Sequence, residues 1–159
     1  MLQFNSSGLL VPNTNIPSTL QELNAEFVVK IPSPQRLSLY GQYLNYSTQL
    51  KSLCGGIDFV QWIDGSFVTK TPDPSDMDIV TFLDFNLVAK LGVALKPFIY
   101  PQSESTFHMD AYIVTIYPEK NPKSFYYASD LAYWMDKFDK TRRNRRGNRY
   151  AKGFLQIIY

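Results

Sequence analysis

Apolar residues recur at helical spacing in the segment 33–56, which reads SPQRLSLYGQYLNYSTQLKSLCGG. The expected apolar stripe consists of Leu37, Tyr40, Leu44 and Leu50. Ser33 is a favourable N-cap, and Pro34 suits the first helical position. The glycine pair Gly55-Gly56 favours a stop at the other end. The pattern therefore predicts a helix between these two signals.

Three shorter apolar runs predict strands. They read IDFVQWI (57–63), DMDIVTFL (76–83) and TFHMDAYIVTIY (106–117). The first run ends at Asp64-Gly65-Ser66, and the proline-rich stretch TPDPSD before the second run predicts a loop. Between the second and third runs, DFNLVAKLGVALK (84–96) predicts a helix capped by Asp84.

The two ends of the chain carry weaker signals. Residues 124–140 predict a helix, and its apolar face is formed by Tyr127, Leu131, Trp134 and Phe138. The closing GFLQIIY (153–159) is either a strand or a docked tail. Residues 1–33 contain three prolines and many Asn and Ser, and they predict an arm over the core. Within this arm, STLQELNAEFV predicts a short helix that Ser18 would cap.

The predicted order is helix, strand, strand, helix, strand, helix. This order predicts an α/β or α+β domain in which helices pack on a small mixed sheet. The chain has 159 residues, of which 45% are hydrophobic and 19% are charged. These values are typical of one globular domain that spans residues 1–159.

Several signals bear on the cellular compartment. The first residues, MLQFNSSGLLVPNTN, have no basic n-region and no long apolar core, so no signal peptide is expected. No apolar run approaches the roughly 18 residues of a membrane span. Cys54 is the only cysteine, which excludes an intrachain disulfide and suits a reducing compartment. We therefore expect a cytoplasmic protein without membrane contact.

Positive charge is concentrated in residues 137–152, termed here the basic segment. It holds eight basic residues and one acid, a net charge of +7, whereas the rest of the chain holds eight basic and thirteen acidic residues, a net charge of −5. Three interpretations stay open: a solvated flexible segment, a grip on a triphosphate, and a contact with an RNA backbone. Arg149 and Lys152 are expected to face a site, because they lie where the chain returns to an apolar segment.

Asp76 and Asp78 are the first candidate functional residues. Residues two apart on a strand share a face, so both carboxylates project together while Met77 and Ile79 enter the core. Two like charges this close resist ionisation unless a cation lies between them, and Mg²⁺ is a hard cation that takes carboxylate oxygens. The alternative is a pair of aspartates on a solvated strand face.

Asp110 occupies a similar setting on the third predicted strand, between two apolar residues. If the second and third strands are neighbours, it converges with Asp76 and Asp78. Three carboxylates around two metal ions about 3.5–4 Å apart suit in-line phosphoryl or nucleotidyl displacement. The three aspartates are therefore predicted to form a two-metal Mg²⁺ site, although Asp110 alone also fits an edge-strand charge. His108 shares the predicted face of Asp110; it is interpreted as a neutral strand histidine with a local hydrogen bond, and the alternative is a contact with substrate or metal.

Gly65 and Ser66 precede the carboxylate pair by one short loop. Glycine lets the backbone approach a ligand, and a helical turn after Ser66 would aim N–H groups and a hydroxyl at a phosphate. By itself the pair is also typical of a simple turn. Lys70, within the loop, either reaches a phosphate or is solvated. Asp64 is interpreted as a turn residue.

The complete motif resembles the signature of the polymerase-beta-type nucleotidyltransferase superfamily. That signature is apolar-Gly-Ser, nine intervening residues, Asp-apolar-Asp-apolar and a later apolar-Asp-apolar strand; it is matched at Gly65, Ser66, Asp76, Asp78 and Asp110. The resemblance implies that Gly65 and Ser66 hold the triphosphate tail. It also implies that Asp76 and Asp78 bind metals and phosphates, and that Asp110 helps to activate the acceptor hydroxyl.

A narrower resemblance covers most of the chain. The stretches GLLVP, WIDGSFVTKTPDPSDMDIV and NRYAKGFLQI are similar to a small bacterial family of minimal nucleotidyltransferase-like proteins. Minimal relatives in this superfamily often belong to toxin–antitoxin or phage-defence pairs, which implies a hetero-complex partner for this chain.

Two functions follow from the residues and the resemblance. The first is a magnesium-dependent nucleotidyltransferase that moves a nucleoside monophosphate from a nucleoside triphosphate to an acceptor hydroxyl on a protein, an RNA 3′ end or a small molecule. The second is a non-catalytic protein of the same fold that binds a nucleotide, an RNA or a partner. The expected nucleotide-binding residues are Gly65, Ser66, Lys70, Arg149 and Lys152.

Overall fold

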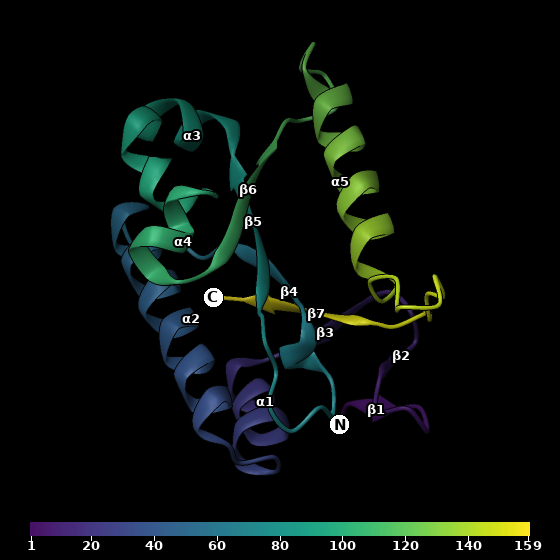
Figure 1. The fold of residues 1–159 in the computed structure, drawn as a ribbon. Helices are drawn as coiled ribbons and strands as arrows, with labels where there is room; N and C mark the ends of the chain where they lie inside the picture. Colours follow the sequence, from purple (N-terminus) through teal and green to yellow (C-terminus); the bar gives the residue numbers. More distant parts are fainter.

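A five-stranded mixed sheet forms the centre of the computed structural model, which describes residues 1–159 (Figure 1). In spatial order the strands are β3 (Asn15–Ser18), β7 (Phe154–Ile158), β4 (Val60–Asp64), β5 (Asp78–Asp84) and β6 (Asp110–Ile116). Strand β4 runs antiparallel to both β7 and β5, whereas the outer pairs β3–β7 and β5–β6 are parallel. Together with the helices, this sheet confirms the predicted mixed α+β class.

Helices cover both faces of the sheet (Figure 1). One side holds α2 (Pro34–Leu53), α3 (Phe85–Leu91), a 3-10 helix (Gly92–Phe98) and α4 (Gln102–Phe107), and the other side holds α5 (Ser124–Phe138). Ile63 and Ile79 enter the larger hydrophobic core on the α2 side. Trp62 and Val80, one position away on the same strands, pack with Trp134 on the α5 side. None of the helices combines the length and hydropathy needed to cross a membrane.

The amino-terminal residues contribute more than the predicted arm. They form β1 (Gln3–Phe4), β2 (Leu10–Val11), β3, α1 (Leu20–Asn24) and a π-helix (Ala25–Val29). Strands β1 and β2 pair with each other, while β3 joins the main sheet beside β7. The cap of α1 is Thr19, whose side chain accepts the Glu22 N–H at 3.1 Å, so the prediction of Ser18 as the cap was wrong. Ser18 instead donates its hydroxyl to the Glu22 carboxylate at 3.0 Å.

Helix α2 begins and ends where the sequence predicts. The side chain of Ser33 accepts the N–H of Arg36 at 3.2 Å, and Pro34 occupies the first turn. At the other end, Gly55 and Gly56 adopt φ values of 77° and 81°, a left-handed conformation that favours glycine.

The apolar stripe predicted for α2 is only partly correct. Leu50 is fully buried, but Leu37 is 64% exposed. The buried residues are Arg36, Leu39, Tyr43, Tyr46, Ser47 and Leu50. Polar members belong to this face because they find partners inside the core: the hydroxyls of Tyr43 and Ser47 donate to Gln61 at 3.0 and 3.2 Å. A stripe drawn through apolar residues alone therefore misses the buried side.

The helix predicted over 84–96 is present in two parts. Asp84 caps it as expected, accepting the Asn86 N–H at 2.9 Å. The α-helical part ends at Leu91, and Gly92, with φ of 49°, starts the 3-10 helix. The change of helix type falls where glycine permits a backbone conformation that other residues avoid.

His108 does not lie on the strand that carries Asp110, so its predicted place on a shared strand face was wrong. Residues 102–107 form α4, and His108 ends this helix with φ of 58°. The buried hydroxyl of Ser103 donates to the Met109 carbonyl at 2.8 Å, which fixes the turn from helix to strand. Strand β6 therefore starts only at Asp110.

The carboxyl-terminal elements agree with the sequence. Trp134 and Phe138 are buried on α5, and Tyr127 and Leu131 pack against the same cluster, as the predicted face requires. Of the two readings of GFLQIIY, the strand is correct: residues 154–158 form β7, which lies between β3 and β4.

Arg36 fixes the loop after β4 to helix α2. Its side chain is 0% exposed, and its guanidinium donates to five main-chain carbonyls. The acceptors are Phe27, Phe67, Thr69, Thr71 and Pro72. Burial lowers the pKa of Arg36, and the carbonyl oxygens compensate the buried charge.

We predict that Arg36→Met destabilises the protein by about 3–5 kcal/mol, because the substitution leaves several buried carbonyls without a donor. Urea unfolding followed by far-ultraviolet circular dichroism measures the change. Arg143→Met, at an exposed arginine, is the matched control and should cost less than about 0.5 kcal/mol. A cost below about 1 kcal/mol for Arg36→Met would contradict the role assigned to Arg36.

Candidate functional site

The carboxylates predicted as metal ligands meet at one end of the sheet. Asp78 opens β5 and lies directly opposite Asp110, the first residue of β6. On its other side Asp78 pairs with Asp64, the last residue of β4. Residues in register present their side chains to the same face, and Asp76 precedes β5 by two positions. Asp64 is thus a strand residue, and its interpretation as a turn residue was wrong.

A cavity of about 380 Å³ opens beside these strand ends. Its acidic lining consists of Asp64, Asp76 and Asp78. Its basic lining comes from the end of α5 and the basic segment, and consists of Lys137, Lys140, Arg142 and Lys152. Asp110 borders a neighbouring cavity of about 290 Å³, which Asp76 also lines. Asp76 therefore lies between the two spaces.

The Gly65-Ser66 turn holds Asp76 in position. Gly65 has φ of 88°, and a Cβ atom there would lie 2.8 Å from the carbonyl oxygen of Asp76. The Ser66 N–H and hydroxyl both donate to Asp76 Oδ1, at 2.8 and 2.5 Å. The same hydroxyl accepts the N–H of Ser75 at 2.9 Å. The predicted helical turn is present as a 3-10 helix (Ser66–Val68), but the donors of Ser66 contact Asp76.

Arg142 lies between the two central carboxylates. One of its terminal nitrogens is 3.1 Å from Asp76 Oδ2 and 3.6 Å from Asp78 Oδ2. The Arg142 side chain is 75% exposed, whereas the two carboxylates are 22% and 8% exposed. The basic segment thus supplies the cation that two neighbouring carboxylates require.

Two further cations complete the charged walls. Lys152, buried to 5% exposure, donates to Asp64 in an ion pair that is buried on both sides. Lys137 lies 4.5 Å from the ring centroid of Trp134 and 5.2 Å from that of Tyr112, so its ammonium is held by aromatic faces beside Asp78. Lys137 and Lys152 thus both place a positive charge beside the carboxylates.

The carboxylates differ in their affinity for protons. Burial raises the pKa of Asp78 to about 6, and the charge of Asp76 adds to this effect. Burial also acts to raise the pKa of Asp76, but the hydrogen bonds from Ser66 and the charge of Arg142 outweigh it and hold that pKa below its ordinary value. Burial raises the pKa of Asp64 against the opposing attraction of Lys152. Asp76 is therefore the carboxylate whose ionised form is stabilised most directly by its neighbours.

The side chains at these strand ends offer the kind of ligand atom that a magnesium ion prefers. All of the ligands offered are carboxylate oxygens, which hard cations prefer, and Arg142 already marks the place of a cation between Asp76 and Asp78. No three acidic, histidine or cysteine side chains converge closely enough in this structure to hold a metal ion. A metal ion between Asp76 and Asp78 would therefore have to displace Arg142 from the two carboxylates.

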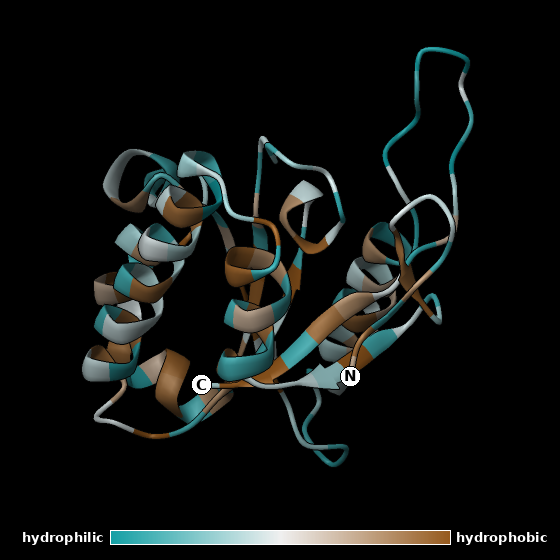
Figure 2. Ribbon diagram, turned by 90° about the horizontal axis from the view of Figure 1, so that it is seen from below, coloured by the Kyte–Doolittle hydropathy of each residue, from teal (hydrophilic) through white to brown (hydrophobic).

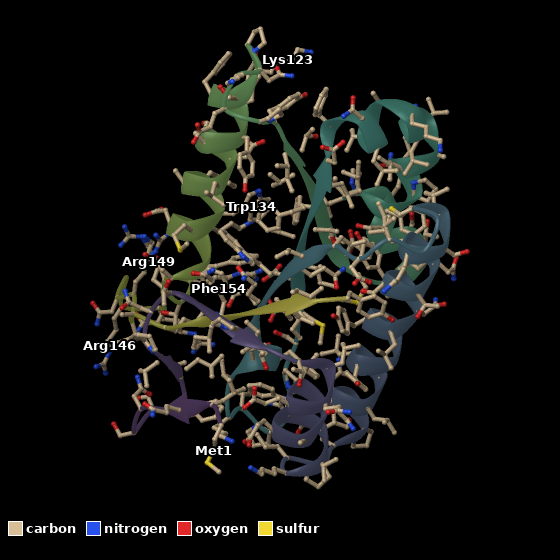
Figure 3. The ribbon with its side chains drawn as sticks, turned by 180° about the vertical axis from the view of Figure 1, so that it is seen from behind. Met1, Lys123, Trp134, Arg146, Arg149 and Phe154 are labelled. Atoms are coloured by element: carbon tan, nitrogen blue, oxygen red, sulfur yellow. The ribbon has the colours of Figure 1, made fainter.

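Other residues predicted for the site lie elsewhere. Lys70 is 3.7 Å from Glu26 and 4.0 Å from the ring centroid of Phe4, and it does not line the cavity. Arg149 is exposed and points away from the body of the protein (Figure 3). Of the two basic residues expected to face the site, Lys152 alone does so.

Sequence reasoning missed Lys137, Arg142 and Asp64 as members of the site. Asp64 had one signal. It lies two residues after Trp62 on an apolar strand and directly before the glycine, so it shares a strand face with Trp62 and, once the strands pair, with the carboxylates. Lys137 and Arg142 had only the general excess of charge around them. Their contacts depend on how α5 lies across the sheet, which no local pattern encodes.

The fold and the site define a mixed α+β protein with a charged cavity at one end of its sheet. The sequence model of one protein family matches residues 2–158, and its description is a family of unknown function (DUF6932). The match spans nearly the whole chain, and the protein belongs to this family. No curated protein and no solved structure matches the chain.

We predict that Gly65→Ala destabilises the protein by about 3 kcal/mol, because a Cβ at this position combines a left-handed backbone with a collision against Asp76. Gly56→Ala is the matched control, since φ there is 81° but no atom lies within 4 Å of the new Cβ. It should cost about 1 kcal/mol. Chemical unfolding measures both, and equal costs would contradict the close approach of the turn to Asp76.

We predict that Arg142→Gln strengthens metal binding at the carboxylates about threefold, the size expected for loss of an exposed ion pair worth about 0.5–1 kcal/mol. Mn²⁺ replaces Mg²⁺ as the probe, and electron paramagnetic resonance measures the free ion. Arg143→Gln removes the same charge from a residue without a carboxylate partner and should leave the affinity unchanged. Unchanged affinity in Arg142→Gln would contradict competition between Arg142 and the metal.

Proposed function

We propose that the protein is a magnesium-dependent nucleotidyltransferase, which moves a nucleoside monophosphate from a nucleoside triphosphate to an acceptor hydroxyl. One observation carries the proposal: Asp78 and Asp110 are paired in register, with Asp76 beside them, and a cationic wall lines the cavity that Asp76 and Asp78 share. Carboxylates for a divalent cation and basic groups for phosphates are the two components that nucleotidyl transfer needs.

The carboxylates have separate duties in this proposal. Asp76 and Asp78 hold Mg²⁺ with the help of Asp110, and the ion, when bound, supplies charge neutralisation for the triphosphate. Asp110 heads the edge strand β6 and borders the second cavity, from which an acceptor has access to it. Its carboxylate takes the proton from the acceptor hydroxyl while the acceptor oxygen bonds to the α-phosphorus of the nucleoside triphosphate. The bond between the α- and β-phosphates breaks in the same step, and pyrophosphate leaves.

The cations bind the triphosphate. Lys137, Lys140 and Lys152 line the cavity together with Arg142, and each offers N–H donors to phosphate oxygens. Arg142 is exposed and held only by its two carboxylate contacts, so it exchanges Asp76 and Asp78 for a phosphate when the nucleotide enters. Lys152 stays on Asp64, since both partners are buried.

A second candidate function is a non-catalytic protein that binds a nucleotide, an RNA or a protein partner. The observation in its favour is that the protein satisfies its own site: Arg142 neutralises Asp76 and Asp78, and Ser66 directs its N–H and hydroxyl to Asp76. In this case the carboxylates serve to hold the basic segment in place, and phosphate binding needs no metal.

We predict that Asp76→Asn/Asp78→Asn abolishes both Mg²⁺-dependent nucleotide binding and transfer. Calorimetric titration of the four ribonucleoside triphosphates, first with Mg²⁺ and then with EDTA, measures binding. Transfer is followed with a triphosphate labelled at its α-phosphate. Glu119→Gln/Asp130→Asn is the control, because it removes two exposed carboxylates that have no ion-pair partner and lie outside the cavity.

The outcomes separate the two candidates. Binding that requires Mg²⁺ and is lost in the double variant supports the enzyme. Transfer that survives the double substitution overturns the enzyme assignment. Nucleotide binding that is equal in Mg²⁺ and EDTA, and unchanged by the double substitution, favours the non-catalytic function.

A further inference from the structure

The outer part of the basic segment, residues 141–150, forms a hairpin with its own hydrogen bonds; it is termed here the basic hairpin. The Thr141 N–H donates to the Tyr150 carbonyl at 2.8 Å, and the Asn144 N–H donates to the Asn148 carbonyl at 2.9 Å. The Asn144 side chain also accepts two N–H groups across the tip. The hairpin projects from the body as the long hydrophilic loop of Figure 2. It is therefore shaped in advance of any partner.

The arginines beyond the base of the hairpin have no carboxylate partners. They are Arg143, Arg145, Arg146 and Arg149, and none takes part in an ion pair. The two acids at the base, Asp136 and Asp139, pair with Lys140 instead, at 2.5 and 3.2 Å. Figure 3 shows Arg146 and Arg149 directed away from the core. The basic hairpin thus presents four guanidinium groups to solvent.

The residue types of the hairpin fit phosphate and base contacts. A shallow cavity of about 340 Å³ is lined by Asn144, Arg145, Arg146, Asn148 and Tyr150. Guanidinium groups match phosphate oxygens in geometry, and asparagine amides can bond to base edges. Tyr150 is 54% exposed, and its ring offers a stacking surface. Stacking on an exposed ring requires an unpaired base, which favours a single strand over a duplex.

The hairpin leads directly to the carboxylates. Its second residue, Arg142, is the one that contacts Asp76 and Asp78, and Asp76 also lines the cavity of about 290 Å³ that Asp110 borders. We propose that the basic hairpin docks the sugar-phosphate backbone of a single-stranded nucleic acid and directs its terminal hydroxyl to Asp110. The docking stands by itself, whereas the delivery of the hydroxyl rests on the proposed nucleotidyl transfer.

The test measures docking without metal or nucleotide. Fluorescence anisotropy follows single-stranded RNA, single-stranded DNA and duplex RNA of about 20 nucleotides in EDTA, between about 50 and 200 mM salt. The variant Arg143→Gln/Arg145→Gln/Arg146→Gln/Arg149→Gln should bind a single strand at least about tenfold more weakly at low salt. It should also lower the slope of log affinity against log salt by about 3, the value for four lost phosphate contacts.

Two matched controls separate this surface from general charge and from exposed rings. Lys90→Gln/Lys96→Gln/Lys120→Gln/Lys123→Gln removes the same charge from exposed lysines without ion pairs, and should change the affinity less than about threefold. Lys123 lies at the far end of α5 (Figure 3). Tyr150→Ala should weaken binding about tenfold, whereas Tyr126→Ala, at an equally exposed ring, should leave it unchanged.

Three outcomes would decide against the proposal. Equal losses in the two quadruple variants would assign binding to net charge. Tighter binding of duplex RNA would overturn the single-strand assignment, and competition by polyglutamate as strong as that by RNA would assign the hairpin to an acidic protein. The variant Asp76→Asn/Asp78→Asn should bind the single strand at least as tightly as the wild type, because it removes two negative charges and frees Arg142. A variant that loses transfer but keeps docking therefore tests the proposed nucleotidyl transfer alone. A hairpin variant that loses docking but still transfers to a small acceptor tests the docking surface alone.

Discussion

The buried guanidinium of Arg36 is the interaction on which the geometry of the site depends. A charge with no exposed surface has to be compensated inside the protein, and here five main-chain carbonyls accept its N–H groups while the charge of Asp73 favours the protonated guanidinium. Four of those carbonyls, from Phe67, Thr69, Thr71 and Pro72, belong to the loop between Ser66 and Asp76. Because Arg36 fixes this loop on helix α2, the loop returns to the Gly65-Ser66 turn, where Ser66 takes up the Asp76 carboxylate. The contact with α2 thus holds the loop together with hydrogen bonds inside it, such as that from the Thr71 N–H to the Thr69 hydroxyl at 3.2 Å.

The carboxylates create the second constraint, since strand register places Asp64, Asp78 and Asp110 side by side. Like charges at neighbouring strand ends are unfavourable, as the raised pKa of Asp78 indicates. The chain answers with cations from its last quarter, Arg142 on Asp78 and Lys152 on Asp64. The site therefore has acidic walls from β4, β5 and the residue Asp76 before β5, and basic walls from the end of α5 and the residues that follow it. The pairing of β7 with β4 contributes to this division, because β7 follows the basic segment and brings it back to the carboxylates.

Local signals explain which features were predictable from the sequence. Ser33 and Asp84 are caps whose partners lie within three residues, and the Asp76–Asp78 spacing states directly that both side chains share a face. The mixed fold class follows from the order of such local elements. Features that depend on distant partners were missed. Helix α2 turns Tyr43 and Ser47 toward Gln61 in the core, and this orientation leaves Leu37 exposed. Arg142 gave no local signal, because its two carboxylates lie more than sixty residues away in the sequence. Lys70 was assigned to the site by sequence proximity, but Glu26 and Phe4 hold it elsewhere.

The charge balance of the cavity constrains how a phosphate ligand enters. Three carboxylates and four cationic side chains line it, and one of the cations, Lys140, is already paired with Asp136 and Asp139 outside the lining. The remaining charges are balanced, so an added triphosphate brings an excess of negative charge into a partly buried space. A phosphate that draws Arg142 away also leaves Asp76 and Asp78 without their cation, and this makes the same excess worse. A divalent ion placed between the carboxylates and the phosphate reduces both excesses. Under the proposed function, nucleotide and metal therefore strengthen each other's binding, and Arg142 keeps the carboxylates compensated until both are present.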